Sequence, residues 1–369
     1  MENLYNVSIE EMSEHQETWF EASENFLSPF TTVLTFKNSP WLMLPDLTNK
    51  FGRTLVNVFS GKQKHVFLPE SHGKRCCGTS HGWLIMVDSS LVITLYNPLT
   101  RAELQLPPLS CCNDELRPGI TLQSVFEPFK SSITSIFCRN NAKETNIHKV
   151  VLSSNPANGH DECIVMAIYG KLRKLAFCKV GDKTWTVTEH EKNFYEDIIY
   201  HSNNFFAVDE YGRVVRCDLA SSMVTQVTPP WTFKGDKMYL AGTSRGLLLA
   251  TRFIETKPDS TYRTKRFTIY QLNQIDDETY GQCERVGDLG NQMLFVGQNH
   301  SVLIPVPRFS AQGDCIYFTD DHLNQHQNGL GGGHDVGVFD LKDNNCIELQ
   351  PLWQGNSVWS TPTWVMLES

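Results

Sequence analysis

Beyond the first 75 residues, short apolar runs recur in groups of four, and this repeat leaves the chain few possible folds. Runs of β-branched, aromatic and aliphatic residues alternate with Gly, Asn, Asp and Pro, which is typical of strands joined by turns. The five groups are residues 76–107, 149–189, 196–228, 237–288 and 293–352. Four strands in about 40 residues is the pattern of a β-propeller blade. The sequence therefore predicts an all-β propeller.

An internal repeat supports this prediction. The stretch "GTSHGWL" at 78–84 recurs as "GTSRGLL" at 242–248, with Arg245 in the place of His81. Two adjacent cysteines precede the first copy, so a metal or nucleophile site is one interpretation of it. The second copy lacks the histidine, so the motif itself does not require metal-binding or nucleophilic chemistry.

We interpret the motif as a tight turn between the first and second strands of a blade. Gly78 and Gly82 would supply backbone freedom at the turn. Thr79 and Ser80 would hydrogen-bond to the turn amides.

The two ends of the chain are expected to close the ring. Residues 53–70 indicate a two-stranded hairpin, and "SVWSTPTWVMLES" at the C-terminus holds one or two apolar strands. Together they form a composite blade, which makes six four-stranded blades and removes the open sheet edges that favour aggregation. The propeller then spans residues 39–366, and the insert at 110–147 becomes an elaborated connection between blades.

Residues 1–38 are expected to form an arm that is partly helical or disordered. Ile9, Met12, Trp19 and Phe20 lie among acidic residues, as in a short amphipathic helix. The arm has no apolar core of a signal peptide, and no apolar run approaches the roughly 20 residues of a membrane helix. We therefore expect a soluble chain in the cytoplasm, the nucleus or both.

Charge and cysteine usage narrow the function classes. The formal net charge is −9 and no basic cluster stands out, which argues against nucleic-acid and membrane binding. The eleven cysteines include no Cys-x-x-Cys pair, so we expect reduced, mostly buried thiols rather than zinc ligands.

Enzyme signatures are weak. The sequence has no Gly-x-Ser-x-Gly elbow and no phosphate-binding loop. His322, His326 and His334 fall in a polar, glycine-rich insertion, which we interpret as a solvated loop. The predicted inner strands offer only Glu196, Asp197 and His201 as titratable groups facing the channel. We therefore predict no catalytic residue, no metal and no cofactor.

A protein partner is the better expectation. Trp and Arg near the mouth of a propeller are frequent anchors for a partner. His81 and Arg245 occupy equivalent turns, and three tryptophans lie in or beside turns rich in proline. The predicted partner-binding residues are His81, Arg245, Trp231, Trp353 and Trp359.

Several of these stretches also resemble, in the same order, the plant KIB-type β-propeller family of F-box-associated proteins. The resemblance covers residues 38–366. The matching stretches are "SPWLMLP" (39–45), "RCCGTSHGWLIMVD" (75–88), "LYNPLTRAELQLPPL" (95–109), "GKLRKLAFCKVGDKTWT" (170–186), "YHSNNFFAVDEYGRVVRCDL" (200–219) and "FTDDH" before "VGVFDL" (318–341).

The resemblance implies a non-enzymatic interaction module like the substrate-binding propeller of SCF-type ubiquitin ligases. The partner would be a kinase or another ubiquitylation substrate. Typical members also carry an N-terminal F-box that docks on the Skp adaptor, and residues 1–38 show no such module. Skp binding is therefore in question. Two alternatives stay open: an adaptor with a degenerate Skp contact, and an enzyme that uses the central channel.

Overall fold

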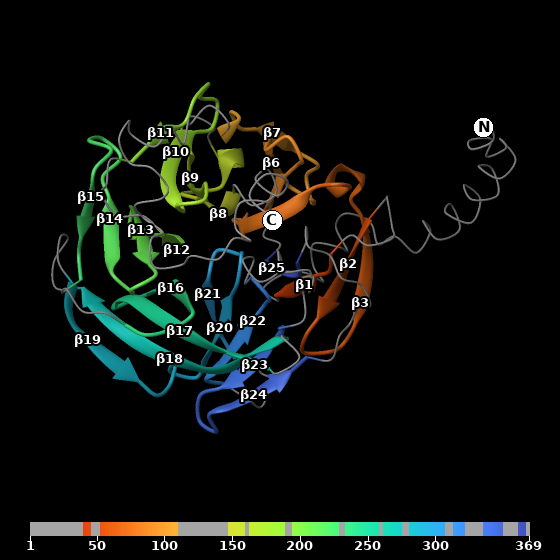
Figure 1. Ribbon diagram of the computed structural model, residues 1–369. Helices are drawn as coiled ribbons and strands as arrows, with labels where there is room; N and C mark the ends of the chain where they lie inside the picture. The colour runs from red at the N-terminus through yellow and green to blue at the C-terminus, as the bar shows by residue number, and fades with distance from the viewer. Residues whose placement is uncertain are drawn as a thin grey trace, which may run out of the picture.

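The computed structural model forms a ring of sheets around a central axis (Figure 1). The residues described are 40–45, 52–109, 147–158, 162–188, 194–228, 233–257, 261–274, 280–306, 313–321, 335–349 and 361–366. The predicted arm, the insert at 110–146 and the segment 350–360 lie outside them. Within the described part, strands make up the six sheets, and short 3-10 turns occur at Pro69–Ser71 and Pro156–Asn158.

Blades 1 to 4 each have four antiparallel strands in sequence order from the axis outward. Blade 1 consists of β4 (Arg75–Ser80), β5 (Trp83–Val87), β6 (Ile93–Tyr96) and β7 (Glu103–Gln105). Blade 2 consists of β8 (Ile147–Leu152), β9 (Ile164–Tyr169), β10 (Lys174–Lys179) and β11 (Thr186–Val187). Blade 3 consists of β12 (Tyr195–His201), β13 (Asn204–Asp209), β14 (Val214–Cys217) and β15 (Val224–Gln226). Blade 4 consists of β16 (Lys237–Thr243), β17 (Gly246–Thr256), β18 (Tyr262–Gln274) and β19 (Tyr280–Val286).

Blade 5 departs from the predicted four strands. Its strands are β20 (Gln292–Val296), β21 (Val302–Pro305), β22 (Cys315–Phe318), β23 (Gly337–Asp340) and β24 (Asn345–Glu348). The order is β21-β20-β22-β23-β24, with β20 and β22 parallel. The four-strand pattern of the group 293–352 predicts a single inner strand at 293–306, but this stretch is a hairpin instead. Its polar sequence "GQNHS" breaks the apolar run and lets the chain turn back.

Blade 6 is the predicted composite. Its order is β25 (Thr363–Val365), β1 (Trp41–Met43), β2 (Gly52–Asn57) and β3 (Gln63–Phe67), so that the C-terminal strand supplies the innermost position. Leu42 pairs with Trp364 across the antiparallel junction of β1 and β25. The six-bladed ring is thus confirmed. The closing blade joins the C-terminal strand to the predicted hairpin, with β1, which the prediction did not include, between them.

Apolar packing between blades forms the core. Six clusters of buried side chains each join two neighbouring blades. At the closure, the Trp364 ring is 1% exposed and lies edge-on to Phe295, with ring centroids 5.2 Å apart. The Thr79 hydroxyl donates to the Trp364 carbonyl at 2.7 Å, which joins blade 1 to blade 6.

The repeated motif does form the turn between the first two strands, but its side chains act differently from the prediction. His81 and Gly82 have φ values of 50° and 76°, as a two-residue turn of the mirror-image type requires. Gly78 serves a close approach instead, because a Cβ there would lie 2.3 Å from the Val150 carbonyl oxygen. The predicted amide contacts of Thr79 and Ser80 are wrong: Thr79 bonds across the ring closure, and no partner of the Ser80 hydroxyl lies among the described residues.

The inner strands of blades 1, 2 and 3 carry a β-bulge near their starts, between Cys76 and Gly78, Ile147 and Lys149, and Tyr195 and Asp197. A bulge sets two residues opposite one and redirects side chains. Both faces of a blade pack against neighbouring blades, so Cys76 is buried in the cluster between blades 6 and 1 and Cys77 in the cluster between blades 1 and 2. Burial raises the pKa of the Cys77 thiol to about 12, so it is not a thiolate nucleophile at neutral pH.

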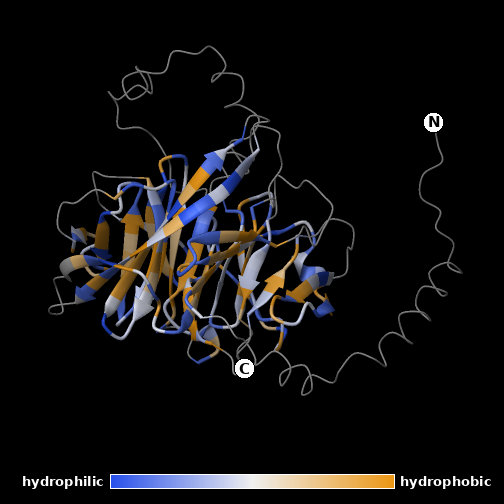
Figure 2. Ribbon diagram, turned by 90° about the horizontal axis from the view of Figure 1, so that it is seen from below, coloured by the Kyte–Doolittle hydropathy of each residue, from blue (hydrophilic) through white to orange (hydrophobic). Residues whose placement is uncertain are grey.

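Blade 4 is longer than its neighbours. Lys237 at the start of β16 pairs with Arg252, so residues 253–256 of β17 and their partners on β18 extend past the inner strand. Figure 2 shows a long strand pair projecting beyond the ring, with a hydrophilic outer end.

Replacing Trp364 tests the closure. Trp364→Ala should lower the free energy of unfolding by about 3–5 kcal/mol, since it leaves a cavity between blades 5 and 6. Urea unfolding of the intact chain measures this. Ile347→Ala, on the exposed edge strand β24, is the control and should cost no more than about 0.5 kcal/mol. Equal effects of the two substitutions would contradict the role of Trp364.

Candidate functional site

The two ends of the ring differ in chemistry. We call the end where the inner strands begin, near Lys149, Glu196 and Lys237, the start face. The end with the turns at His81 and Arg245 is the turn face. Each face holds a cavity, one of about 290 Å³ on the start face and one of about 790 Å³ on the turn face.

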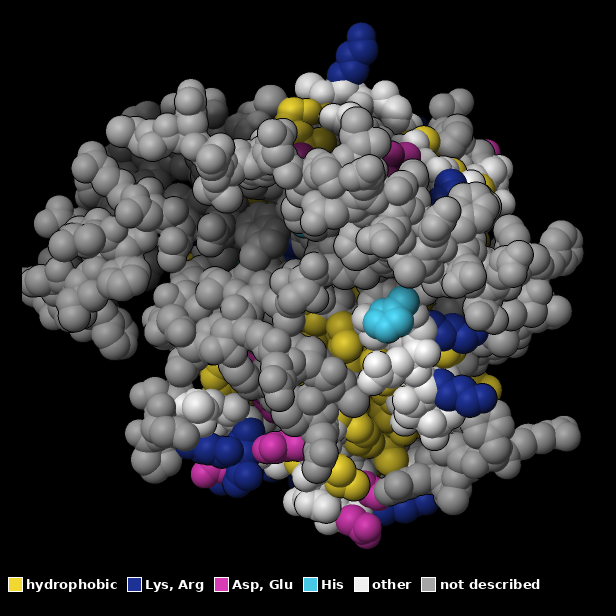
Figure 3. Space-filling view, turned by 90° about the vertical axis from the view of Figure 1, so that its right-hand side faces the viewer, with side chains coloured by type: hydrophobic (Ala, Val, Ile, Leu, Met, Phe, Trp, Pro, Cys, Tyr) yellow, Lys and Arg dark blue, Asp and Glu magenta, His cyan; other side chains and the backbone are white. Residues whose placement is uncertain are grey.

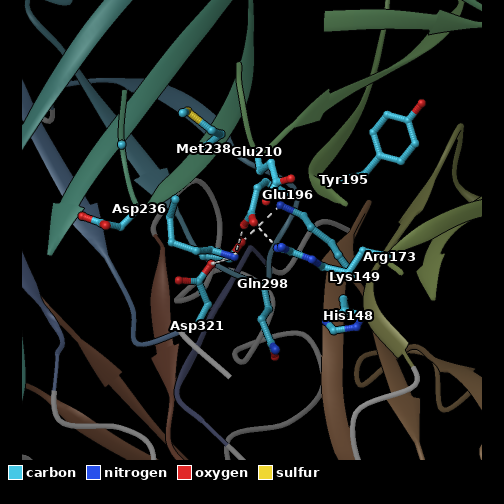
Figure 4. A pocket seen from close by; sticks show the side chains of 13 residues that line it. His148, Lys149, Arg173, Tyr195, Glu196, Glu210, Asp236, Met238, Gln298 and Asp321 are labelled. Atoms are coloured by element: carbon cyan, nitrogen blue, oxygen red, sulfur yellow. Dashed lines mark hydrogen bonds and ion pairs between the residues drawn. The ribbon is translucent and has the colours of Figure 1, made fainter. Parts of the chain in front are cut away.

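Charged side chains from four blades line the start-face cavity. Figure 4 shows Lys149, Arg173, Glu196 and Asp321 converging on its middle, whereas Tyr195 and Met238 point away. The other lining residues are His148, Glu210, Gly235, Asp236, Lys237, Gly297 and Gln298.

Ion pairs link these groups from blade to blade. Glu196 pairs with Arg173, and its other oxygen lies 2.8 Å from the Lys237 ammonium. Lys237 also lies 3.9 Å from Asp321 of blade 5. Burial lowers the pKa of Lys237, but Glu196 and Asp321 outweigh burial and raise it above its ordinary value. Lys237 is therefore held charged between two carboxylates.

A second pair lies deeper. Lys149 of blade 2 pairs with Asp197 of blade 3 and donates to the Gly297 carbonyl at 3.1 Å. Asp197 also accepts the backbone N–H of Leu240 in blade 4 at 2.8 Å. These contacts join four blades through two side chains.

Arg252 anchors the network behind the cavity. Its side chain is fully buried, and its guanidinium lies 3.1 Å from Asp321 and 2.8 Å from Asp335. It also donates to the Tyr239 hydroxyl at 3.0 Å and to the Thr264 hydroxyl at 2.7 Å. A buried guanidinium is tolerated only with such complete pairing.

The sequence prediction found only part of this site. Glu196 lines the start-face cavity and Asp197 pairs with Lys149 of that cavity, but His201 lies at the opposite end, on the turn face. Lys149 and Lys237 were missed, although each begins a predicted inner strand with a charge. The bulge in β12 was also missed, and it explains how the consecutive residues Glu196 and Asp197 both reach the network.

The loop 297–301 of blade 5 crosses the channel between the two cavities. Gly297 accepts from Lys149 of blade 2, and the His300 backbone N–H donates to the Thr79 carbonyl of blade 1 at 3.0 Å. The rings of His300 and His81 are 6.4 Å apart. The turn predicted within one blade thus contacts a loop from another.

The turn-face cleft lies between blades 4 and 5. Leu248, Leu289 and Leu303 contribute apolar surface, and Arg245, His201 and Asp288 contribute charge or polarity. Arg245 is exposed on the turn between β16 and β17. This cleft combines an apolar lining with a few polar groups, as binding sites commonly do.

The structure describes only two of the five predicted partner-binding residues. His81 and Arg245 lie at equivalent turns on the turn face, in blades opposite each other across the ring. Trp231, Trp353 and Trp359 lie outside the described residues. The described neighbours of Trp231, Thr228 and Phe233, precede β16 and so belong to the start face. Partner contact by all five residues stays a prediction.

The described ranges hold no group of three or more His, Cys, Asp or Glu side chains arranged for a metal ion. His322, His326 and His334 lie outside them. Within the same ranges, no helix is long and apolar enough to cross a membrane. The expected location in the cytoplasm, the nucleus or both stays a prediction.

Comparison with known families decides the classification. The sequence model of the KIB1-4 β-propeller matches residues 55–340. The chain belongs to the KIB1-4 β-propeller family. This confirms the resemblance seen in the sequence, and the match spans parts of all six blades.

Relatives of the chain carry F-box names. "Putative F-box protein At5g55150" of Arabidopsis thaliana is 29% identical over 88% of this chain and 84% of its own length. F-box protein SKIP23 of the same plant is 25% identical over 88% of this chain and 83% of its own. A solved Cps50 (Swd1) β-propeller domain covers 87% of this chain and 88% of its own, at 8% identity and a TM-score of 0.38. That score is too low to carry an argument.

Replacing Arg252 tests the ion network. Arg252→Met should lower the free energy of unfolding by about 3–5 kcal/mol, because it leaves buried Asp335 without its cation and Asp321 with only the more distant Lys237. Chemical denaturation measures this. Lys265→Met, which removes an exposed pair with Glu255 on the same blade, is the control and should cost no more than about 1 kcal/mol. A stable Arg252→Met protein would show that the network contributes little.

Two histidines should make the fold acid-sensitive. Burial, followed by nearby Arg173 for His148 and Lys149 for His300, lowers the pKa of both rings to about 3. Both rings stay neutral in the folded chain, whereas in the unfolded chain they take up protons below about pH 6.5. The free energy of unfolding should therefore fall as the pH drops from about 6.5 towards 3, by at most about 1.4 kcal/mol per pH unit for each ring.

Unfolding in urea at pH 7 and pH 5 tests this. The double variant His148→Gln, His300→Gln should lose much of the pH dependence, since glutamine does not titrate. The variant His65→Gln, at an exposed position, should keep it. An unchanged dependence in the double variant would contradict the assignment.

Proposed function

We propose that this propeller is a non-enzymatic protein-interaction module that holds substrates, like the propellers of plant F-box proteins in SCF-type ubiquitin ligases. The family match carries the proposal. The chain also covers more than four fifths of the two relatives compared, which bear F-box names. In this role the propeller binds a protein that is then ubiquitylated.

The ring itself supports an interaction role. Interlocked apolar clusters and the ion network hold the blades rigid, while loops at both faces are free to vary. The charges of the start-face cavity are engaged with one another: Glu196 bridges two cations and Lys237 lies between two carboxylates. Mutual pairing of this kind suits joining blades better than general acid–base catalysis, which needs a group able to exchange a proton at neutral pH.

The electrostatics favour a protein partner over nucleic acid. The net charge is −9. On the side next to β2 and β3, the described Lys and Arg side chains are interspersed with Asp and Glu (Figure 3). Mixed charge of this kind gives no extended positive field for a phosphate backbone.

Partner identity is a further part of the proposal. A kinase or another ubiquitylation substrate is the proposed partner, by analogy with the family. Docking on the Skp adaptor is a separate question, because the segment that would carry it lies outside the described residues. Catalysis in the channel is the rival, since propellers also host hydrolases and lyases.

Proximity labelling with the intact chain in plant cells tests the proposal. A defined set of proteins should be labelled, and the variant Trp231→Ala, Arg245→Ala should label them less. Arg263→Ala, at an exposed position on blade 4, should label them as the native chain does. Co-purification with Skp separates the adaptor from a propeller that acts alone.

A general hydrolase screen with metal analysis addresses the rival. We expect no turnover. Turnover that disappears in Glu196→Gln while the fold is retained would replace the interaction proposal with an enzyme.

A further inference from the structure

We propose that the turn-face cleft between blades 4 and 5 binds a peptide segment of the partner that carries an apolar side chain next to an acidic one. The apolar side chain would occupy the leucine-lined part of the cleft, and the acidic side chain would pair with Arg245. This inference rests on the proposed function and gives it a location and a partner chemistry.

The apolar part of the cleft comes from two blades. Leu248 of β17 and Leu289, before β20, are 5% and 6% exposed and are held in the apolar cluster between blades 4 and 5. Leu303 of β21 and Val286 of β19 are partly exposed beside them. An apolar side chain placed here would remove mainly the exposed surfaces of Leu303 and Val286 from water, at about 25 cal/mol per Å².

The cation of the cleft is Arg245. It is exposed, and the described residues include no ion-pair partner for its guanidinium. Its charge contrasts with a chain of net charge −9, so it marks a local preference for an anion. A guanidinium binds a carboxylate through two parallel hydrogen bonds, which fixes the orientation of the ligand.

One carboxylate also lines the cleft. Asp288 accepts the backbone N–H of Gly290 at 3.0 Å, so its carboxylate is engaged with its own loop. His201 is on the opposite wall, against Gly242, and burial lowers its pKa, so it is neutral at physiological pH.

The inner end of the cleft is already ordered. The buried Gln271 amide donates to the Leu247 carbonyl at 3.2 Å, and the Thr243 hydroxyl donates to the Gly246 carbonyl at 3.2 Å. The turn that carries Arg245 is closed by the pairing of Thr243 with Gly246. A preordered site loses little conformational entropy when a ligand binds.

The size suits a short peptide. The cleft holds about 790 Å³ and opens to solvent on the turn face. Ligand clefts in proteins commonly measure about 300–1,000 Å³. With one cation beside an apolar surface, the cleft matches a single apolar–acidic pair rather than a polyanion.

A peptide array probed with the purified intact chain tests the inference. Each peptide has eight positions, with Leu, Met, Phe, Gln or Ser in the centre and Glu, phosphoserine, Lys or Ala beside it. The native chain should select peptides with an apolar centre and Glu. Arg245→Glu should bind these about tenfold more weakly and shift the preference to Lys.

The matched control is Arg263→Glu, the same charge change at an exposed position at the other end of blade 4. It should select the same peptides as the native chain. Unchanged selection by Arg245→Glu, equal binding of Gln-centred peptides, or a preference for phosphoserine over Glu would each overturn the inference. If proximity labelling finds partners but the array shows no Arg245 dependence, only this inference fails; if the chain labels no partner, the proposed function fails as well.

Discussion

Closure of the ring is the constraint on which the rest of this structure depends. Each blade can bury its two faces only against neighbouring blades, so the first and last blades must pack against each other. β25 meets this need by entering blade 6 as the innermost strand, with Trp364 packed against blade 5 and its carbonyl bonded to Thr79 of blade 1. The first and last strands that the structure describes, β1 and β25, therefore lie within one sheet, and every apolar cluster has a blade on each side.

Around the central axis, polar groups rather than apolar faces must find partners. Inner strands of a propeller converge on a narrow channel, where backbone and side-chain polar groups lose contact with water. The chain solves this with opposite charges from successive blades, Lys149 with Asp197 and Glu196 with Lys237. The bulges near the strand starts bring neighbouring side chains to the same region, so one strand can supply two partners.

Ring closure and the ion network leave the start face and the turn face with different chemistry. On the start face the charged side chains satisfy one another, and the loop 297–301 bonds to blades 1 and 2 across the channel. On the turn face the cleft between blades 4 and 5 leaves Arg245 at the surface, beside a leucine-lined wall. Rigidity and recognition can then reside at opposite ends of one ring, so that a change in recognition need not weaken the axis.

The sequence by itself determined the all-β class, the blade repeat and the composite closing blade, because each is written in local apolar periodicity and turn residues. The family followed from the resemblance of several stretches to known family members. The sequence also located the turns of His81 and Arg245. The hairpin of blade 5, the bulges and the ion network were decided only by tertiary structure. A bulge shifts the strand register by one residue and leaves no distinctive residue pattern in the sequence. An ion pair such as Lys149 with Asp197 joins residues of different blades. The same limit applies to Thr79, whose hydroxyl was predicted to serve its own turn and instead bonds to the far end of the chain, which only ring closure brings near.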